Sequence, residues 1–167
     1  MKAIKLAEPW QVACVELDKP TPKPGEALIR IVTAGICGSD IGAFRGTNGL
    51  VSYPRVIGHE LAGIVESIPD GNKNGIRPGD RVVVDPYLYC GHCYPCRIGR
   101  TNCCTDLKVL GVHVDGGMAE YYCHPADMLI KIPDGMTWEE AAMAEPLTIS
   151  PVSYTHLRAH ETLSERV

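Results

Sequence analysis

Four cysteines within fifteen residues form the most distinctive chemical pattern of the 167-residue chain. Cys90, Cys93, Cys96 and Cys104 give the spacing C-x2-C-x2-C-x7-C. Short C-x2-C turns place two thiolates on one ion, and four such ligands suit the tetrahedral preference of zinc. The segment holds few large apolar residues, so a metal would take the place of a core. The spacing therefore predicts a structural zinc lobe over about residues 88–108.

The cysteine pattern also leaves alternatives open. An iron–sulfur cluster uses C-x2-C-x2-C too, but its bacterial run continues x3-C-P, whereas here the last gap is seven residues and Thr105 follows. The four cysteines could instead be reduced and unligated. His92 and Cys103 are substitute ligands, although Cys104 is preferred to Cys103. Three nearby bases either offset the charge of bound thiolates or form a solvated face: Arg97, Arg100 and Lys108.

A second, more dispersed set of residues could also hold zinc. Cys37, His59, Glu60 and Glu145 have side chains of the right types, because zinc accepts thiolate, imidazole and carboxylate ligands. Taken alone the set is weak, since a lone cysteine or histidine is usually structural. Adjacent His59 and Glu60 would point to opposite faces of a regular strand, so both could approach one ion only at a strand start or bend. Three further residues have no assigned partner and are interpreted as structural: Cys14, Cys123 and His124.

The elements that must position these side chains read mostly as short strands and turns. The chain has 17 glycines and 13 prolines, and motifs such as Pro24-Gly25-Glu26 and Pro78-Gly79-Asp80 precede β-rich runs. Such a pattern favours a small barrel or sandwich. Thr137 to Glu140 has capping-box spacing and opens a helix through Ala144, which Pro146 is expected to limit. The expected strands are 2–6, 11–17, 27–34, 60–68, 81–85, 118–123 and 128–132.

The C-terminal segment does not read like the rest of the chain. Val152–Thr162 resembles the translation of a transposase sequencing adapter, so residues 151–167 are expected to be a non-native tail. A weak polar helix there would place His156 and His160 on one face. The spacing lacks the glutamate of H-E-x-x-H, and no role is assigned to the two histidines.

Composition excludes several classes of function. Sixteen basic and 20 acidic residues give a net charge of −4. This mild negative charge does not indicate binding to nucleic acid or to an anionic membrane. Apolar runs such as Val82–Val84 are far shorter than the roughly 18 residues of a membrane span. The N-terminus has no apolar signal-peptide core, so a cytoplasmic location is expected. Thiols stay reduced there, which favours metal ligation over disulfides.

The order of the motifs resembles a known family. GICGSD, GHE, the four-cysteine lobe, DGGMAEY and AEPL follow one another as in the zinc-dependent medium-chain dehydrogenases of the alcohol dehydrogenase superfamily, most closely their sorbitol/threonine dehydrogenase-like branch. The resemblance covers about residues 1–150. It implies a mainly β, GroES-like, partly open β-barrel with short helices and a zinc lobe, which is the N-terminal catalytic domain of such enzymes.

The resemblance also implies roles for the candidate residues. Cys37, His59 and Glu60 would be ligands of a catalytic zinc, with Glu145 reaching the same ion, and the four lobe cysteines would hold a structural zinc. Two zinc ions per chain are therefore expected. Zinc in an open site acts as a Lewis acid on an alcohol oxygen, and the substrate carbon then gives a hydride to NAD or NADP. The expected substrate is a small secondary alcohol or ketone: a polyol, a sugar acid or a threonine-like compound.

The proton route departs from the family pattern. Ser39 matches the hydroxyl that passes the alcohol proton outward, and Glu60 could exchange with water on zinc during turnover. Many relatives continue the relay with a histidine where this chain has Gly42. His113 and Asp115 are candidates for the exit, although a turn-forming role is favoured for both.

A site for the hydride acceptor is not visible in the sequence. A dinucleotide fold needs a G-x-G-x-x-G turn before a helix, and no such pattern occurs. In the family that Rossmann domain follows AEPL. We therefore expect this chain to be the catalytic half of a homo-oligomeric NAD(P)-dependent dehydrogenase and to be inactive alone. The alternative is a stand-alone zinc-binding module without catalysis.

Overall fold

The computed structural model describes residues 1–149. The expected adapter-like tail at 151–167, with His156 and His160, lies outside the described residues. The strands are β1 (Lys2–Glu8), β2 (Gln11–Glu16), β3 (Glu26–Ala34), β4 (Arg55–Val56), β5 (Leu61–Ser67), β6 (Arg81–Val84), β7 (Tyr87–Leu88), β8 (Lys108–Val109), β9 (Tyr121–Pro125) and β10 (Leu129–Lys131). The helices are α1 (Gly38–Arg45), α2 (Tyr94–Arg97) and α3 (Trp138–Ala142), with 3-10 turns η1 (Thr101–Cys103) and η2 (Ala126–Met128). The mainly β prediction is confirmed.

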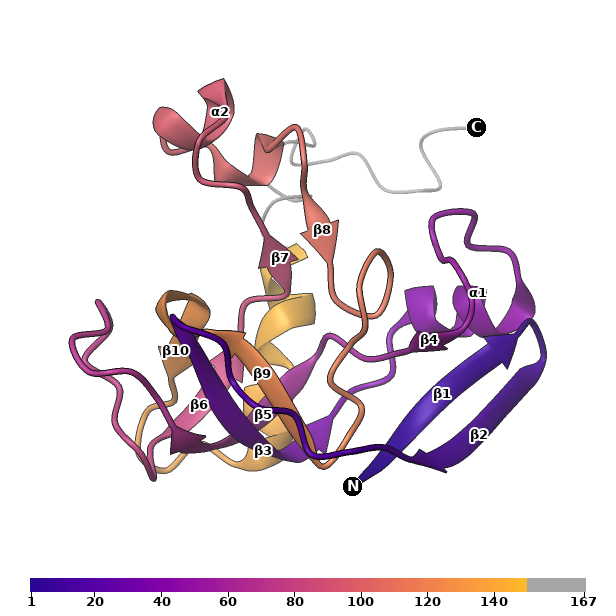
Figure 1. Ribbon diagram of the computed structural model, residues 1–167, viewed down its shortest axis with the longest axis horizontal. Coiled ribbons are helices and arrows are strands. Elements are labelled where there is room, and N and C mark those ends of the chain that lie inside the picture. Colours follow the sequence, from indigo (N-terminus) through magenta and orange to yellow (C-terminus); the bar gives the residue numbers. More distant parts are fainter. Residues whose placement is uncertain (150–167) are drawn as a thin grey trace, which may run out of the picture.

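A five-stranded antiparallel sheet carries the main core (Figure 1). Its strand order is β10-β6-β5-β3-β9, so strands close together in the sequence are not always neighbours. Ile29, Val65, Val82 and Leu129 point into one buried cluster with Leu110. Burial of these branched side chains supplies the main driving force for closing the sheet.

A three-stranded sheet, β2-β1-β4, lies beside the first. The two are joined where Ile4 N–H donates to Met118 O over 2.8 Å and Ala3 bridges to Ala119. Leu6 packs in a second buried cluster with Ile57. Among residues 1–149, no helix has the length and apolar character needed to cross a bilayer.

The observed elements differ from the expected ones at particular points. β9 begins at Tyr121 rather than at residue 118 because the preceding backbone turns towards another partner: Gly117 N–H donates to Gly58 O and Met118 N–H to Ile57 O. Helix α1 was not expected. Asp40 closes a capping box with Cys37 at its start, and Gly46 ends it with a φ of 72°.

Helix α3 starts where the sequence predicts. Thr137 Oγ1 accepts from Glu140 N–H over 3.2 Å, and Glu140 Oε2 accepts from Thr137 N–H over 2.8 Å, which completes the capping box. The expectation that Pro146 limits the helix is wrong, because residues 144–149 are again helical and include it. Proline is tolerated there since a first helical turn does not need its N–H.

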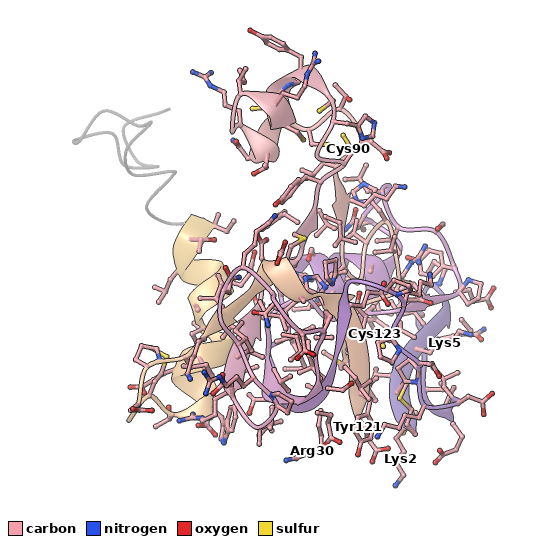
Figure 2. All side chains as sticks on the ribbon, turned by 60° about the vertical axis from the view of Figure 1, so that its left-hand side comes forward. Lys2, Lys5, Arg30, Cys90, Tyr121 and Cys123 are labelled. Atoms are coloured by element: carbon pink, nitrogen blue, oxygen red, sulfur yellow. The ribbon has the colours of Figure 1, made fainter. Side chains whose placement is uncertain are left out.

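The four-cysteine segment stands out from the sheets as a separate lobe. The short ribbon of β7 and β8 leads up to it, and α2 and η1 form its tip (Figure 1). In the side-chain view Cys90 lies at the base of this lobe, well apart from Cys123 in the body (Figure 2). The ribbon is thus the connection between the lobe and the rest of the described chain.

Candidate metal centres

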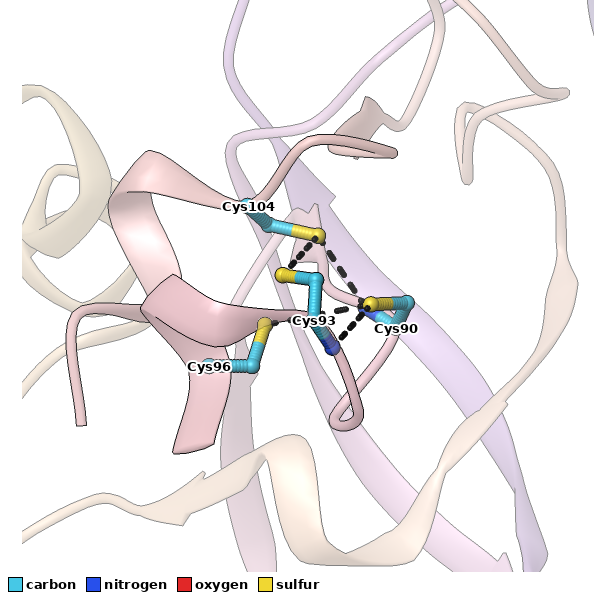
Figure 3. A group of neighbouring side chains, drawn as sticks. All are labelled: Cys90, Cys93, Cys96 and Cys104. Atoms are coloured by element: carbon cyan, nitrogen blue, oxygen red, sulfur yellow. Dashed lines mark hydrogen bonds between the residues drawn. The ribbon is translucent and has the colours of Figure 1, made fainter. Parts of the chain in front are cut away.

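The four lobe cysteines converge on one point. The sulfur atoms of Cys90, Cys93, Cys96 and Cys104 all lie within 4.8 Å of one another (Figure 3). Cys90 Sγ is 4.0 Å from Cys96 Sγ, and Cys93 Sγ is 3.9 Å from Cys104 Sγ. Four thiols at this separation fit one tetrahedral zinc ion, with little else in the lobe to bury.

The backbone of the lobe is turned towards the sulfur atoms. Cys104 Sγ accepts from Cys90 N–H and from Asp106 N–H, each over 3.3 Å. Hydrogen bonds from backbone N–H groups lower the pKa of the Cys93 thiol to about 6. The hydrogen bond from Thr105 makes the largest contribution, and the one from Cys96 the second largest. Such donors stabilise thiolate, which is the form that binds metal.

The residues considered as substitute ligands lie outside this group. Cys103 is exposed, whereas Cys104 is buried. The His92 ring is also exposed, and its Nδ1 lies 2.9 Å from Cys90 O. Of the nearby bases, Lys108 pairs with Asp106, with 3.6 Å between Nζ and Oδ2.

The second group forms between two loops. A ligand atom from each of Cys37, His59 and Glu60 lies within 4.8 Å of the other two. Cys37 is the N-cap of α1, while His59 and Glu60 stand just before β5 begins at Leu61. Glu60 sits at a bend, which lets adjacent side chains approach the same point.

Two glycines allow this approach. Gly58 has a φ of 98°, and a Cβ there would stand 2.8 Å from Met118 Cβ. A Cβ at Gly35 would overlap the Glu60 carboxylate and stand 2.9 Å from Glu60 Cβ. Gly58 thus lets its loop pack against Met118, and Gly35 lets the loop before Cys37 pack against Glu60.

Asp40 joins the two loops and was not identified as a site residue from the sequence. It is buried, with 3% of its surface exposed. Its Oδ2 accepts from Cys37 N–H over 2.9 Å, and its Oδ1 accepts from Gly58 N–H over 3.3 Å. Oδ1 also lies 3.8 Å from His59 Nδ1. The sequence feature that could have identified Asp40 is its position three residues after Cys37, where it completes the capping box of α1.

The second group borders a cavity of about 480 Å³. Ser39 lines it, and Ser39 Oγ lies 3.4 Å from His59 Nε2. Of the two candidates for the proton exit, only His113 lines the cavity. The Asp115 carboxylate accepts a hydrogen bond from Val56 N–H over 3.0 Å. His113 Nδ1 accepts from Val109 N–H over 3.1 Å, which leaves Nε2 as its donor.

Glu145 lines the same cavity but is not brought into the tight group. Its Oε1 instead accepts a hydrogen bond of 2.6 Å from the Tyr87 hydroxyl. Tyr87 was not identified from the sequence, and no local pattern marks it, because 58 residues separate the two partners.

The second donor set has the features that a cation would satisfy. His59 and Glu60 are both buried, with 5% and 6% of their surfaces exposed. Burial is the main cause that raises the pKa of the Glu60 carboxyl, and the nearby Glu145 charge adds to it. A thiol, an imidazole and a carboxylate gathered in this way fit a zinc ion, which would compensate the buried negative charge.

The structural roles expected for three other residues can be compared with their positions. Cys14 is exposed on β2 and Cys123 lies on β9. His124 is fully buried, with Nε2 2.9 Å from Asp85 O. None of the three lies in a metal-ligand group of the described chain.

The chain is similar to known proteins in both sequence and fold. The family profile described as the alcohol dehydrogenase GroES-like domain matches residues 23–134. Over 150 residues, 90% of this chain and 44% of the other, the chain is 54% identical to a zinc-type alcohol dehydrogenase-like protein of Haemophilus influenzae. It is 39% identical, with the same coverage, to L-galactonate-5-dehydrogenase of Escherichia coli.

A solved structure shows the same architecture. The crystal structure of an Escherichia coli alcohol dehydrogenase (rspB) with NADH superposes with a TM-score of 0.85 at 47% identity, over 93% of this chain and 45% of that one. The predicted GroES-like, partly open β fold is thereby confirmed. The chain spans less than half the length of these relatives.

Proposed function

The chain belongs to the zinc-type alcohol dehydrogenases with a GroES-like domain, and from that premise we propose that it is the catalytic domain of an enzyme that interconverts a secondary alcohol and a ketone. NAD or NADP would take or give the hydride. The substrate is proposed to be a polyol, a sugar acid or a threonine-like compound. The relative that acts on L-galactonate, as its name states, supports the sugar-acid class.

One observation carries this proposal: Cys37, His59 and Glu60 converge at the edge of an open cavity. Three protein ligands beside an accessible space are typical of catalytic zinc, whereas structural zinc is closed by four. The cavity volume of about 480 Å³ suits a small substrate.

The surrounding residues have distinct tasks in this proposal. Cys37, His59 and Glu60 would hold zinc, which would act when bound as a Lewis acid towards a substrate oxygen. The Ser39 hydroxyl would accept the substrate proton and pass it outward, with His59 beside it. Part of the cavity lining is apolar, which suits the carbon skeleton of a substrate: Leu50, Val109, Val112 and Ile149.

The lobe is proposed to hold the second, structural zinc, which makes two per chain. Since thiols must remain reduced for this role, the proposal keeps the cytoplasmic location expected from the sequence. We propose that the nicotinamide cofactor is held by a separate dinucleotide-binding domain, because the sequence contains no G-x-G-x-x-G turn. The whole enzyme is proposed to be a homo-oligomer, and this chain alone to be inactive.

The test is a comparison of two cysteine variants in a whole enzyme that contains this chain. Cys37→Ser should lower NAD(P)-dependent oxidation of sugar acids or polyols by at least about 1000-fold, because several kcal/mol of Lewis-acid stabilisation is lost. The control is Cys14→Ser on the exposed surface of β2, which should keep wild-type turnover. Undiminished turnover by Cys37→Ser would refute the proposed function.

A further inference from the structure

The carboxylates of Glu60 and Glu145 both face the cavity at the Cys37–His59–Glu60 group, and they have different partners. Glu60 belongs to the group, whereas the Glu145 carboxylate accepts the Tyr87 hydroxyl over 2.6 Å. No other hydrogen bond to the Glu145 side chain occurs within the described part of the chain. The tyrosine is thus its single fixed partner there.

Tyr87 is itself held firmly in place. Its backbone N–H donates to Asp85 Oδ1 over 3.1 Å, and it pairs with Val109 across the β7–β8 ribbon. Its side chain is half-buried and lines the same cavity as Glu145. A donor on a paired strand cannot easily follow the carboxylate, so the hydrogen bond fixes where Glu145 stands.

The position of Glu145 matters for the chemistry of the site. A fourth protein ligand would close a site that needs an open position for substrate. Glu145 is close enough to Glu60 for the two charges to interact, and a cation between them would attract both. In this structure the second carboxylate lies outside the group and accepts the Tyr87 hydroxyl instead.

We propose that Tyr87 is a positioning residue whose hydroxyl holds Glu145 aside from the Cys37–His59–Glu60 group and thereby keeps one coordination position open. This inference rests on the proposed function, because it presumes a metal ion at that group. It assigns Tyr87 no contact with the substrate.

The experiment is a double-mutant cycle on metal affinity in the purified 167-residue chain. Zinc is titrated against a competing chelator, and cobalt(II) absorption in the visible range reports the ligand set. Tyr87→Phe should free Glu145 to join the group, raise the affinity about tenfold and change the cobalt(II) spectrum. Tyr87→Phe combined with Glu145→Gln should return both readouts to wild-type values.

Two further variants serve as controls. Tyr122→Phe removes a hydroxyl that donates to Asp115 O, away from the group, and should change neither readout. Glu145→Gln alone should keep the wild-type affinity, because in the wild-type chain the Tyr87 hydroxyl already holds the Glu145 carboxylate away from the metal. This variant keeps the proposal testable even if Tyr87→Phe fails to fold.

Several outcomes would overturn the proposal. An unchanged or lower affinity in Tyr87→Phe would mean that the hydroxyl does not restrain Glu145. A lower affinity in Glu145→Gln would make Glu145 a ligand in the wild-type chain. These failures leave the proposed function intact, whereas a wild-type chain in which Cys37→Ala removes no bound metal would refute both.

Discussion

The Asp40 carboxylate faces the imidazole of His59, with 3.8 Å between Asp40 Oδ1 and His59 Nδ1. The same carboxylate accepts from the backbone N–H groups of Cys37 and Gly58. One buried side chain thus ties together the two loops that carry the proposed ligands. Such outer partners orient metal ligands, and their loss typically weakens metal binding.

Asp40→Asn should therefore lower zinc affinity at the Cys37–His59–Glu60 group by about 10–100-fold. Chelator competition measures this effect. The matched control is Asp127→Asn. The Asp127 carboxylate pairs with the exposed Lys73, and both residues are far from Asp40 in the sequence. Equal affinities for Asp40→Asn and wild type would show that Asp40 does not orient the site.

The lobe offers a pair of adjacent cysteines for a second test. Cys104→Ser removes one of the four converging thiols and should lower the melting temperature and release zinc, because the metal replaces a core there. Cys103→Ser changes an exposed neighbour and should leave both unchanged. Thermal melting and zinc analysis of both variants measure these effects. If Cys103→Ser were the variant that melts earlier and loses zinc, the fourth ligand would be Cys103.

Gly35 gives a third test, aimed at Glu60. In Gly35→Ala the new methyl group would overlap the Glu60 carboxylate, so that side chain must move away from Cys37 and His59. Zinc affinity at this group should fall by at least about tenfold. Gly49→Ala is the control, because a Cβ at that position meets nothing within 4 Å. Similar affinities in the two variants would argue against the tight packing of Gly35 on Glu60.

The burial of His124 should make the free energy of unfolding depend on pH. Burial lowers its pKa to about 4, whereas an unfolded histidine titrates near 6.5. Between these values the unfolded chain binds a proton that the folded chain does not. The free energy of unfolding therefore falls as pH drops through this window and levels off below it, by an amount on the order of 3 kcal/mol.

His124→Gln should flatten this part of the pH dependence, because glutamine does not titrate. Urea unfolding at several pH values between about 7 and 4 measures the slope for both proteins. The comparison concerns the slope and not the absolute stability, which the substitution also changes. Identical slopes would mean that His124 is not the responsible group.

Local patterns predicted much of the fold and of the two ligand sets. The Thr137–Glu140 capping box and the spacing from Cys90 to Cys104 depend on residues near one another in the chain, so the sequence alone displays them. The resemblance to a family was needed to group Cys37 with residues over twenty positions away. Tyr87 was missed because its hydrogen bond to Glu145 spans 58 positions. Such a contact arises only from the packing of the whole fold.

The metal content of the purified chain tests the central claim most directly. Elemental analysis of wild-type protein should give two zinc ions per chain, one in the lobe and one at the Cys37–His59–Glu60 group. Cys37→Ala should retain one zinc ion, since it leaves the four lobe cysteines intact. A wild-type value near one that Cys37→Ala leaves unchanged would contradict the second metal centre and, with it, the proposed catalytic role.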